Sequence, residues 1–185
     1  PIEFADHVGS PLHESLLFVH NTLVGAGLRD KIKLGASGKI ITAFDMAKAF
    51  AIGADFLNSG RGFLFSLGCI QALNCSSGNC PTGIATQDPV RQKALDVDVK
   101  ANRVYNYHRS TLHALKELMQ AVGVTHPKEV MPEHIMRRLD THTIASFSEI
   151  MDFTEPNELL DGNPRQKIYQ KYWNKVDENS FGLKK

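Results

Sequence analysis

Apolar side chains near the start of the chain recur every three or four positions, which is the spacing of one helix face. Ser10 can cap such a helix, Pro11 suits its first position, and glycines follow its last apolar position. This pattern predicts a helix over residues 10–27, with its apolar face formed by Leu12, Leu16, Val19 and Leu23.

After this helix, short apolar runs alternate with one amphipathic segment. Residues 31–36 and 54–58 are expected to be strands, and the segment between them a helix. Thr42 and Asp45 form a capping box at the start of that helix, with Asp in place of the usual Glu. A strand–helix–strand unit of this size predicts a parallel crossover and therefore an α/β fold.

Both predicted strands end in turns of glycine and small hydroxyl residues. Ser37-Gly38 follows the first strand, and Ser59-Gly60-Arg61-Gly62 follows the second. Backbone N–H groups in such turns, with a helix N-terminus behind them, can bind a phosphate, and Arg61 can add a charge-assisted contact. The alternative is that Gly38 and Gly60 are only turn glycines, and turn preferences taken alone favour it.

The second half of the chain is predicted to be mainly helical and then rich in turns. A short helix over residues 63–67 leads to the first cysteine, and helices are expected over 98–122 and 132–139. Beyond residue 146 turn residues dominate, and the aromatic tail is expected to form a short helix that contacts a partner surface. The inner face of the long helix is expected to comprise Ala101, Val104, Tyr105, His108, Leu112, Leu115, Met119 and Val122.

Composition and charge restrict the class of protein. The chain has 185 residues, 42% of them hydrophobic and 22% charged, as in an ordinary globular domain. Its formal net charge of +1 gives no strong field for nucleic acid or an acidic membrane. No apolar run approaches the roughly 20 residues that span a bilayer, and no leader is evident, so we expect a cytoplasmic protein.

All three cysteines of the chain, Cys69, Cys75 and Cys80, lie close together, and Pro81 follows the last. Three thiolates on one loop can hold a metal centre, and a proline after the last ligand stiffens the loop, as in bacterial ferredoxins. An odd number of cysteines argues against a disulfide framework, and a zinc site usually needs a fourth ligand. An iron–sulfur cluster with three protein ligands therefore suits the number of cysteines better than zinc, while buried inert cysteines stay open as an alternative.

These motifs together resemble the FMN-binding synthase domain of glutamate synthase, most closely the stand-alone glutamate synthase-like proteins without a glutaminase. The resemblance covers about residues 1–145, whereas residues 146–185 form a C-terminal extension that is only loosely tied to the family. Its basis is Gly35-Ala-Ser-Gly-Lys-Ile, Asn58-Ser-Gly-Arg-Gly, Leu67-Gly-Cys-Ile-Gln, Cys80-Pro-Thr-Gly and Thr86-Gln-Asp-Pro.

The resemblance implies a TIM-type (β/α)8 barrel with FMN at its mouth and a [3Fe-4S] cluster beside it. Electrons would pass from the cluster to FMN, which reduces 2-iminoglutarate to glutamate. Carried over to this chain, Cys69, Cys75 and Cys80 are the cluster ligands on a loop over residues 69–89. The turns at Ser37-Gly38 and Gly60-Arg61 are then the grip on the FMN phosphate.

The chain departs from this family in size, because a full barrel has eight strands in about 250 residues. The two predicted strands resemble the last two of the barrel, and Ala5-Asp6-His7 resembles the end of the loop after strand six. We therefore expect the isolated chain to be inactive, to self-associate, and to need the missing N-terminal strands from the same or another chain. The alternatives are a small non-enzymatic iron–sulfur carrier or an inert remnant. The catalytic residues, the true substrate and the electron donor are not identified by the sequence.

Overall fold

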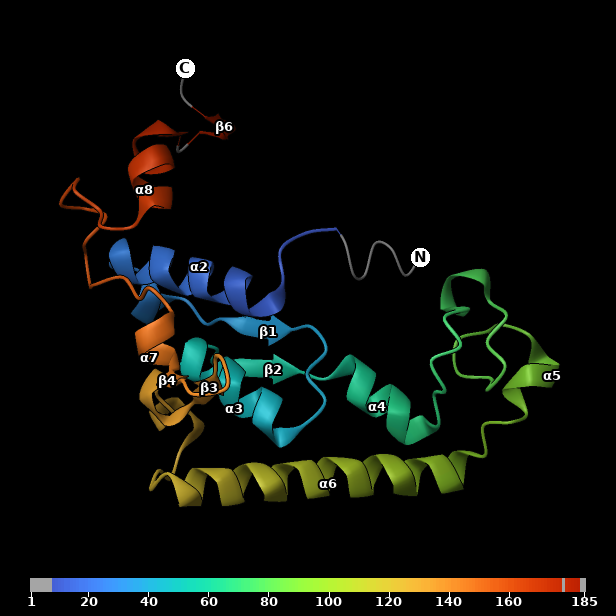
Figure 1. Ribbon diagram of the computed structural model, residues 1–185. Helices are drawn as coiled ribbons and strands as arrows, with labels where there is room; N and C mark the ends of the chain where they lie inside the picture. The colour runs from blue at the N-terminus through green and yellow to red at the C-terminus, as the bar shows by residue number, and fades with distance from the viewer. Residues whose placement is uncertain (1–7, 178, 184–185) are drawn as a thin grey trace.

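The computed structural model describes residues 8–177 and 179–183, so the expectation for Ala5-Asp6-His7 lies outside the described residues. Figure 1 shows a body of helices and short strands from which a loop-rich lobe projects at one end. In chain order, the α-helices and strands are α2 (Leu12–Gly25), β1 (Gly35–Ser37), α3 (Ala43–Ile52), β2 (Phe56–Asn58), α4 (Gly60–Leu67), α5 (Pro89–Gln92), α6 (Val97–Ala121), β3 (Met136–Arg138), β4 (Ile144–Ser146), α7 (Phe147–Ile150), α8 (Lys167–Tyr172), β5 (Val176–Asp177) and β6 (Ser180–Leu183). Short 3-10 helices lie at Arg29–Lys31, Cys75–Ser77, Pro127–Glu129, Pro132–His134 and Trp173–Lys175.

Strands β1 and β2 run parallel, as the strand–helix–strand pattern predicts, with helix α3 as the crossover. Ser37 is in register with Asn58, so both strands end at the same edge of the sheet. Both strands are shorter than expected: β1 begins at Gly35 and β2 at Phe56, and residue 31 belongs to a 3-10 turn. The mixture of helices with a parallel strand pair agrees with the α/β class.

The predicted caps of α3 form as the sequence indicates. The Asp45 N–H donates to the Thr42 hydroxyl at 3.2 Å, and the Thr42 N–H donates to the Asp45 carboxylate at 3.0 Å. Although burial acts to raise it, the hydrogen bonds from Lys48 and Thr42 lower the pKa of Asp45 to about 2. Gly53 ends the helix with a left-handed φ of 116°, a conformation that glycine adopts without steric cost.

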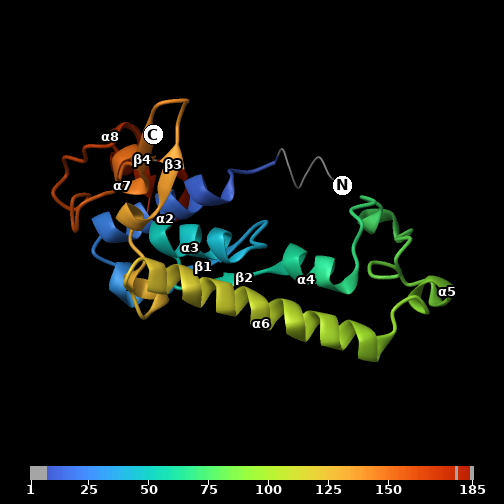
Figure 2. The same cartoon turned by 60° about the horizontal axis from the view of Figure 1, so that its bottom comes forward.

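The core lies where α2, α3 and α6 meet and includes Leu16, Ala47, Ile52, Leu115 and Met119. Helix α6 runs from the projecting lobe to the β3–β4 hairpin and packs on both α3 and α4 (Figures 1 and 2). The prediction for its inner face was partly wrong. Leu115 and Met119 are buried as expected, whereas five predicted positions are exposed: Ala101, Tyr105, His108, Leu112 and Val122. The half-buried positions of α6 include Tyr107, Thr111, Ala114 and Leu118, so the covered face is rotated relative to the face that the apolar pattern implies.

The helix predicted over residues 132–139 is also wrong. Pro132–His134 forms a single 3-10 turn, and β3 then pairs antiparallel with β4. The Phe147 N–H donates to the Ile135 carbonyl at 2.9 Å, just outside this hairpin. Pairing with a later segment therefore overrides the local helical pattern, which sequence periodicity does not detect.

The C-terminal segment packs on helix α2 of the same chain, and the expected contact with a partner surface stays a prediction. The Asn21 side chain, 2% exposed, donates to the Asp152 carbonyl at 2.7 Å and accepts from the Thr154 N–H at 3.2 Å. Further along, the Tyr169 ring stacks on Phe18 with centroids 5.7 Å apart. The expected short aromatic helix is α8, and it is part of the fold.

Among the helices of the described residues, none is both long and apolar enough to cross a membrane.

Candidate functional site

The two glycine turns lie side by side at the carboxyl edge of the β1–β2 pair. Ser37 is the last residue of β1 and Gly38 follows it, whereas Ser59-Gly60 follows Asn58, the last residue of β2 and the register partner of Ser37. Gly60 is the first residue of α4, with Arg61 half-buried in the same turn. A Cβ atom added at Gly60 would meet no atom within 4 Å, so the backbone there is open to close approach by a ligand.

Gly38 also lines a cavity of about 560 Å³ together with Leu12, Phe44 and Arg137. Neither Gly60 nor Arg61 lines this cavity. The structure thus brings the two turns to one sheet edge without enclosing both in this cavity.

Two hydrogen bonds that the sequence did not predict connect the two turns with each other and with α6. The Ser59 hydroxyl donates to the Ile40 carbonyl at 2.6 Å, and the Tyr107 hydroxyl, from α6, donates to the Ile41 carbonyl at 2.6 Å. Tyr107 is half-buried on α6 and was not part of the predicted inner face. The one sequence signal for this contact is Gly62, because a Cβ atom at this position would overlap the Tyr107 hydroxyl.

The three cysteines lie in the lobe that projects beyond α4 and the first turns of α6, on the right of Figure 1. Cys69 follows directly after α4 and is half-buried, Cys75 opens a 3-10 turn and is exposed, and Cys80 is 8% exposed. The helix before this loop ends at Gly68 with a left-handed φ of 103°, which turns the chain out into the lobe.

Cys80 is placed among hydrogen-bond donors. Its sulfur lies 3.3 Å from the Thr82 hydroxyl oxygen. The Thr82 hydroxyl, followed by the N–H of Ala85, lowers the pKa of the Cys80 thiol to about 7. Donors of this kind stabilise a thiolate, which is the form that ligates metals. The chemistry of this residue therefore fits a ligand of a thiolate-bound centre.

The cysteines are nevertheless not assembled into a ligand set. Within residues 8–177 and 179–183, no three His, Cys, Asp or Glu side chains lie close enough together to hold a metal ion. The donor types and their loop thus fit a cluster, whereas the arrangement of the three sulfurs would have to change on binding.

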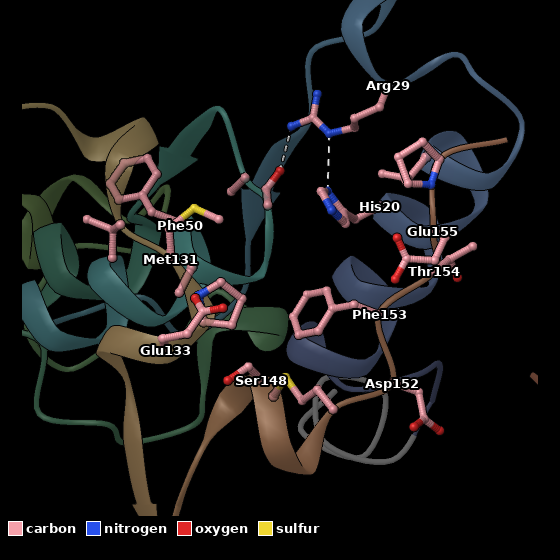
Figure 3. A pocket seen from close by; sticks show the side chains of 18 of the residues that line it. His20, Arg29, Phe50, Met131, Glu133, Ser148, Asp152, Phe153, Thr154 and Glu155 are labelled. Atoms are coloured by element: carbon pink, nitrogen blue, oxygen red, sulfur yellow. Dashed lines mark hydrogen bonds between the residues drawn. The ribbon is translucent and has the colours of Figure 1, made fainter. Parts of the chain in front are cut away.

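A second cavity, of about 1070 Å³, lies at the opposite end of the strand pair, where both strands begin. Figure 3 shows Phe50 and Met131 on one side of it and His20 and Phe153 on the other. Arg29 holds this end together, with its guanidinium 2.8 Å from the Asp55 carboxylate and 3.2 Å from His20 Nδ1.

The ionisable groups at this end of the strand pair, His20, Arg29 and Asp55, contact one another. Burial, and then the Arg29 guanidinium, lowers the pKa of His20 to about 4, so the imidazole is neutral at pH 7. Although burial acts to raise it, the Leu34 N–H and the Arg29 guanidinium hold the pKa of Asp55 below its usual range. These groups join the loop before β1 to the start of β2, and we assign them a stabilising role.

Comparison with known proteins identifies the family. A family model described as a conserved region in glutamate synthase matches residues 1–125. The chain is 42% identical over 149 residues to the glutamate synthase large subunit-like protein YerD of Bacillus subtilis, covering 80% of this chain and 28% of that protein.

Two further relatives also match most of this chain over about a quarter of their own length. The archaeal glutamate synthase (NADPH) of Methanocaldococcus jannaschii is 41% identical over 124 residues, covering 67% of this chain and 24% of the relative. The archaeal-type glutamate synthase (NADPH) of Thermotoga maritima is 37% identical over 119 residues, covering 64% and 24%. The chain thus spans about a quarter of the length of these relatives. Since the family model covers more than half of the chain, this protein belongs to the glutamate synthase family.

Proposed function

We propose that this chain supplies the FMN-phosphate turns and the cluster ligands of a glutamate synthase-like oxidoreductase. The observation that carries the proposal is the juxtaposition of Ser37-Gly38 and Ser59-Gly60 at one edge of a parallel strand pair, with the cysteine loop following in the chain. In β/α barrels, the loops after the last two strands commonly bind a phosphate. The family relationship supports the same assignment.

In this proposal the phosphate binds to backbone N–H groups at the two turns. Gly60 begins an α-helix, so the N–H groups of its first turn have no partner within the helix and point along a favourable dipole. Arg61 adds a positive charge in the same turn. The open space around Gly60 supports close approach of a phosphate oxygen to the backbone.

Cys69, Cys75 and Cys80 are the proposed ligands of a [3Fe-4S] cluster on the loop over residues 69–89. The stabilised thiolate of Cys80 supports this assignment, and the buried position of this residue protects the ligand from solvent. When both groups are bound, the cluster would supply electrons to FMN for the reduction of 2-iminoglutarate to glutamate. The electron donor is left open.

The remaining barrel strands are the proposed partner of this chain, with β1 and β2 as the last two strands of a TIM-type barrel. Ala36 joins the core formed with α2 and α3, whereas Phe56 lies over Gly35 on the other face and is 51% exposed. Parallel sheets are normally covered on both faces, and open edges invite pairing. In the described residues this sheet has only two strands, so both edges are open. We propose that strands earlier in a longer protein, or in a second chain, cover this face.

The Gly60→Val variant tests the phosphate grip directly. Gly60 is exposed, and a Cβ atom added there meets no atom within 4 Å, so we expect the fold to tolerate the change and a loss of FMN affinity to come from blocked approach. Fluorescence titrations with FMN and riboflavin measure it, with Gly60→Ala as the smaller change. We expect a preference for FMN over riboflavin that Gly60→Val abolishes; unchanged FMN affinity would remove Gly60 from the site.

An activity assay separates the proposed enzyme from the non-enzymatic alternatives. With 2-oxoglutarate, ammonium and a reduced viologen as artificial donor, we expect glutamate only when the missing strands are also present. A monodisperse chain that carries iron but neither binds flavin nor gains activity with those strands would favour the iron–sulfur carrier. A chain without iron and flavin would favour the inert remnant.

A further inference from the structure

Tyr107 reaches from the middle of α6 to the turns at the carboxyl edge of the β1–β2 pair. Its hydroxyl donates to the Ile41 carbonyl at 2.6 Å, across 66 positions of sequence, and the residue is half-buried. The next carbonyl toward β1, that of Ile40, accepts from the Ser59 hydroxyl at 2.6 Å. Consecutive carbonyls after β1 are therefore held by the turn after β2 and by α6.

The two donors are also close to each other. The hydroxyl oxygens of Ser59 and Tyr107 lie 3.3 Å apart, while each hydroxyl donates its single proton to a carbonyl. Two adjacent hydrogen bonds to consecutive carbonyls fix the backbone after β1 more firmly than one hydrogen bond does.

The packing of α4 on α6 leaves space for this contact only because residue 62 is glycine. A side chain at Gly62 would overlap the Tyr107 hydroxyl and lie 2.6 Å from the Ser59 hydroxyl oxygen. On the neighbouring position of α4, the Phe63 ring meets the Tyr107 ring edge-on, with centroids 5.2 Å apart and an interplanar angle of 81°. The first turn of α4, with Gly60 and Arg61, is thus held directly against Tyr107.

We infer that Tyr107 is a positioning residue that fixes the spacing between the Ser37-Gly38 turn and the Ser59-Gly60 turn. The link to phosphate binding rests on the proposed function, in which both turns contact one FMN phosphate. A phosphate shared between two backbone segments binds well only when their N–H groups already have the right separation, so loosening one turn lowers affinity without removing a ligand contact.

The Tyr107→Phe variant removes the hydroxyl and keeps the ring against Phe63. Its matched control is Tyr105→Phe, because Tyr105 lies on the same helix, is 60% exposed, and its hydroxyl has no hydrogen bond with any residue that the structure describes. Hydrogen exchange followed by NMR reports the turns directly. In Tyr107→Phe, amides of residues 38–42 and 59–62 are expected to exchange about tenfold faster, the effect of losing one partly buried hydrogen bond. Amides of α2 are expected to be unchanged.

Flavin affinities provide the second measurement. We expect Tyr107→Phe to bind FMN about tenfold more weakly, with riboflavin affinity unchanged, and Tyr105→Phe to match the unmodified protein. Faster exchange at the turns with an unchanged preference for FMN would overturn the link to phosphate binding. Unchanged exchange at the turns would overturn the positioning role altogether.

The test separates this inference from the proposed function. If the unmodified protein binds FMN no better than riboflavin, or binds neither, the phosphate grip fails as a function. The exchange rates in Tyr107→Phe still decide whether Tyr107 fixes the two turns, since they need no ligand.

Discussion

Leu159 provides a quantitative test of whether the C-terminal segment belongs to the folded domain. Its side chain is 2% exposed and lies against Gly25 of α2, where an added methyl group would approach Leu159 Cγ to 2.5 Å. The Leu159 N–H also donates to the Gly25 carbonyl at 3.0 Å. The segment is therefore fixed to the end of α2 by both its backbone and a fully buried side chain.

Replacing Leu159 by alanine removes buried methyl groups and leaves a cavity at this contact. Core Leu→Ala changes lower the free energy of unfolding by about 2–5 kcal/mol. For a chain of this length, each 1 kcal/mol shifts the melting temperature by about 2–4 °C. We expect a loss of about 3 kcal/mol and a fall in melting temperature of about 6–12 °C.

Thermal unfolding followed by circular dichroism measures this effect, and Leu160→Ala is the matched control. Leu160 is adjacent in the chain but 63% exposed, so its replacement is expected to change the free energy of unfolding by less than about 0.5 kcal/mol. If the two variants melt at the same temperature, the C-terminal segment does not pack on α2 in solution, and the domain would end before it.

Three further predictions concern single contacts. Because burial and Arg29 lower the pKa of His20 to about 4, the unfolded chain gains a proton from about pH 6.5 downward that the folded chain does not. The contribution of His20 to the free energy of unfolding is therefore fully present above pH 6.5 and is lost toward pH 4. With allowance for solvent screening this loss is roughly 2 kcal/mol. Urea titrations at several pH values measure it, and we expect His20→Asn to remove it. Thr42→Ala breaks the capping box of α3 and is expected to cost about 1 kcal/mol in the same titration; no change would mean that the cap does not form. Gly62→Ala is expected to destabilise the protein less when Tyr107→Phe is already present, and strict additivity in this double-mutant cycle would show that the two residues do not touch.

The elements that the sequence predicts correctly are those set by local chemistry. The α3 helix follows from apolar spacing and its capping box, and the parallel pair follows from short runs on either side of α3. The α2 helix follows from apolar spacing, but the expected Ser10 cap is wrong, because Pro11 is the N-cap residue and no side chain caps the helix. The predicted helix over 132–139 failed because β3 depends on pairing with β4, a partner that periodicity does not reveal.

In the candidate site too, features set by local sequence are predicted, and features set by contacts between distant segments are not. The turn glycines stand out in the sequence because glycine is typical of turns, and the cysteines because all three lie close together with a proline after the last. Tyr107 does not stand out, because its role depends on α6 folding back over the two strand ends from a distant part of the chain. The assembly of the three sulfurs also cannot be read from spacing, and the described residues do not bring them together.

The iron and sulfide content of protein purified without oxygen, together with a visible absorption spectrum of the same sample, shows whether the cysteine loop holds a cluster. We expect iron and sulfide in the proportions of a [3Fe-4S] cluster, broad visible absorption, and the loss of both when Cys80 is replaced by serine. Exposed Ser76, in the same loop, gives the matched control Ser76→Ala, which is expected to retain the cluster. Protein that carries no iron under these conditions, or Cys80→Ser protein that keeps its full iron and sulfide, would contradict the assignment of the three cysteines as cluster ligands.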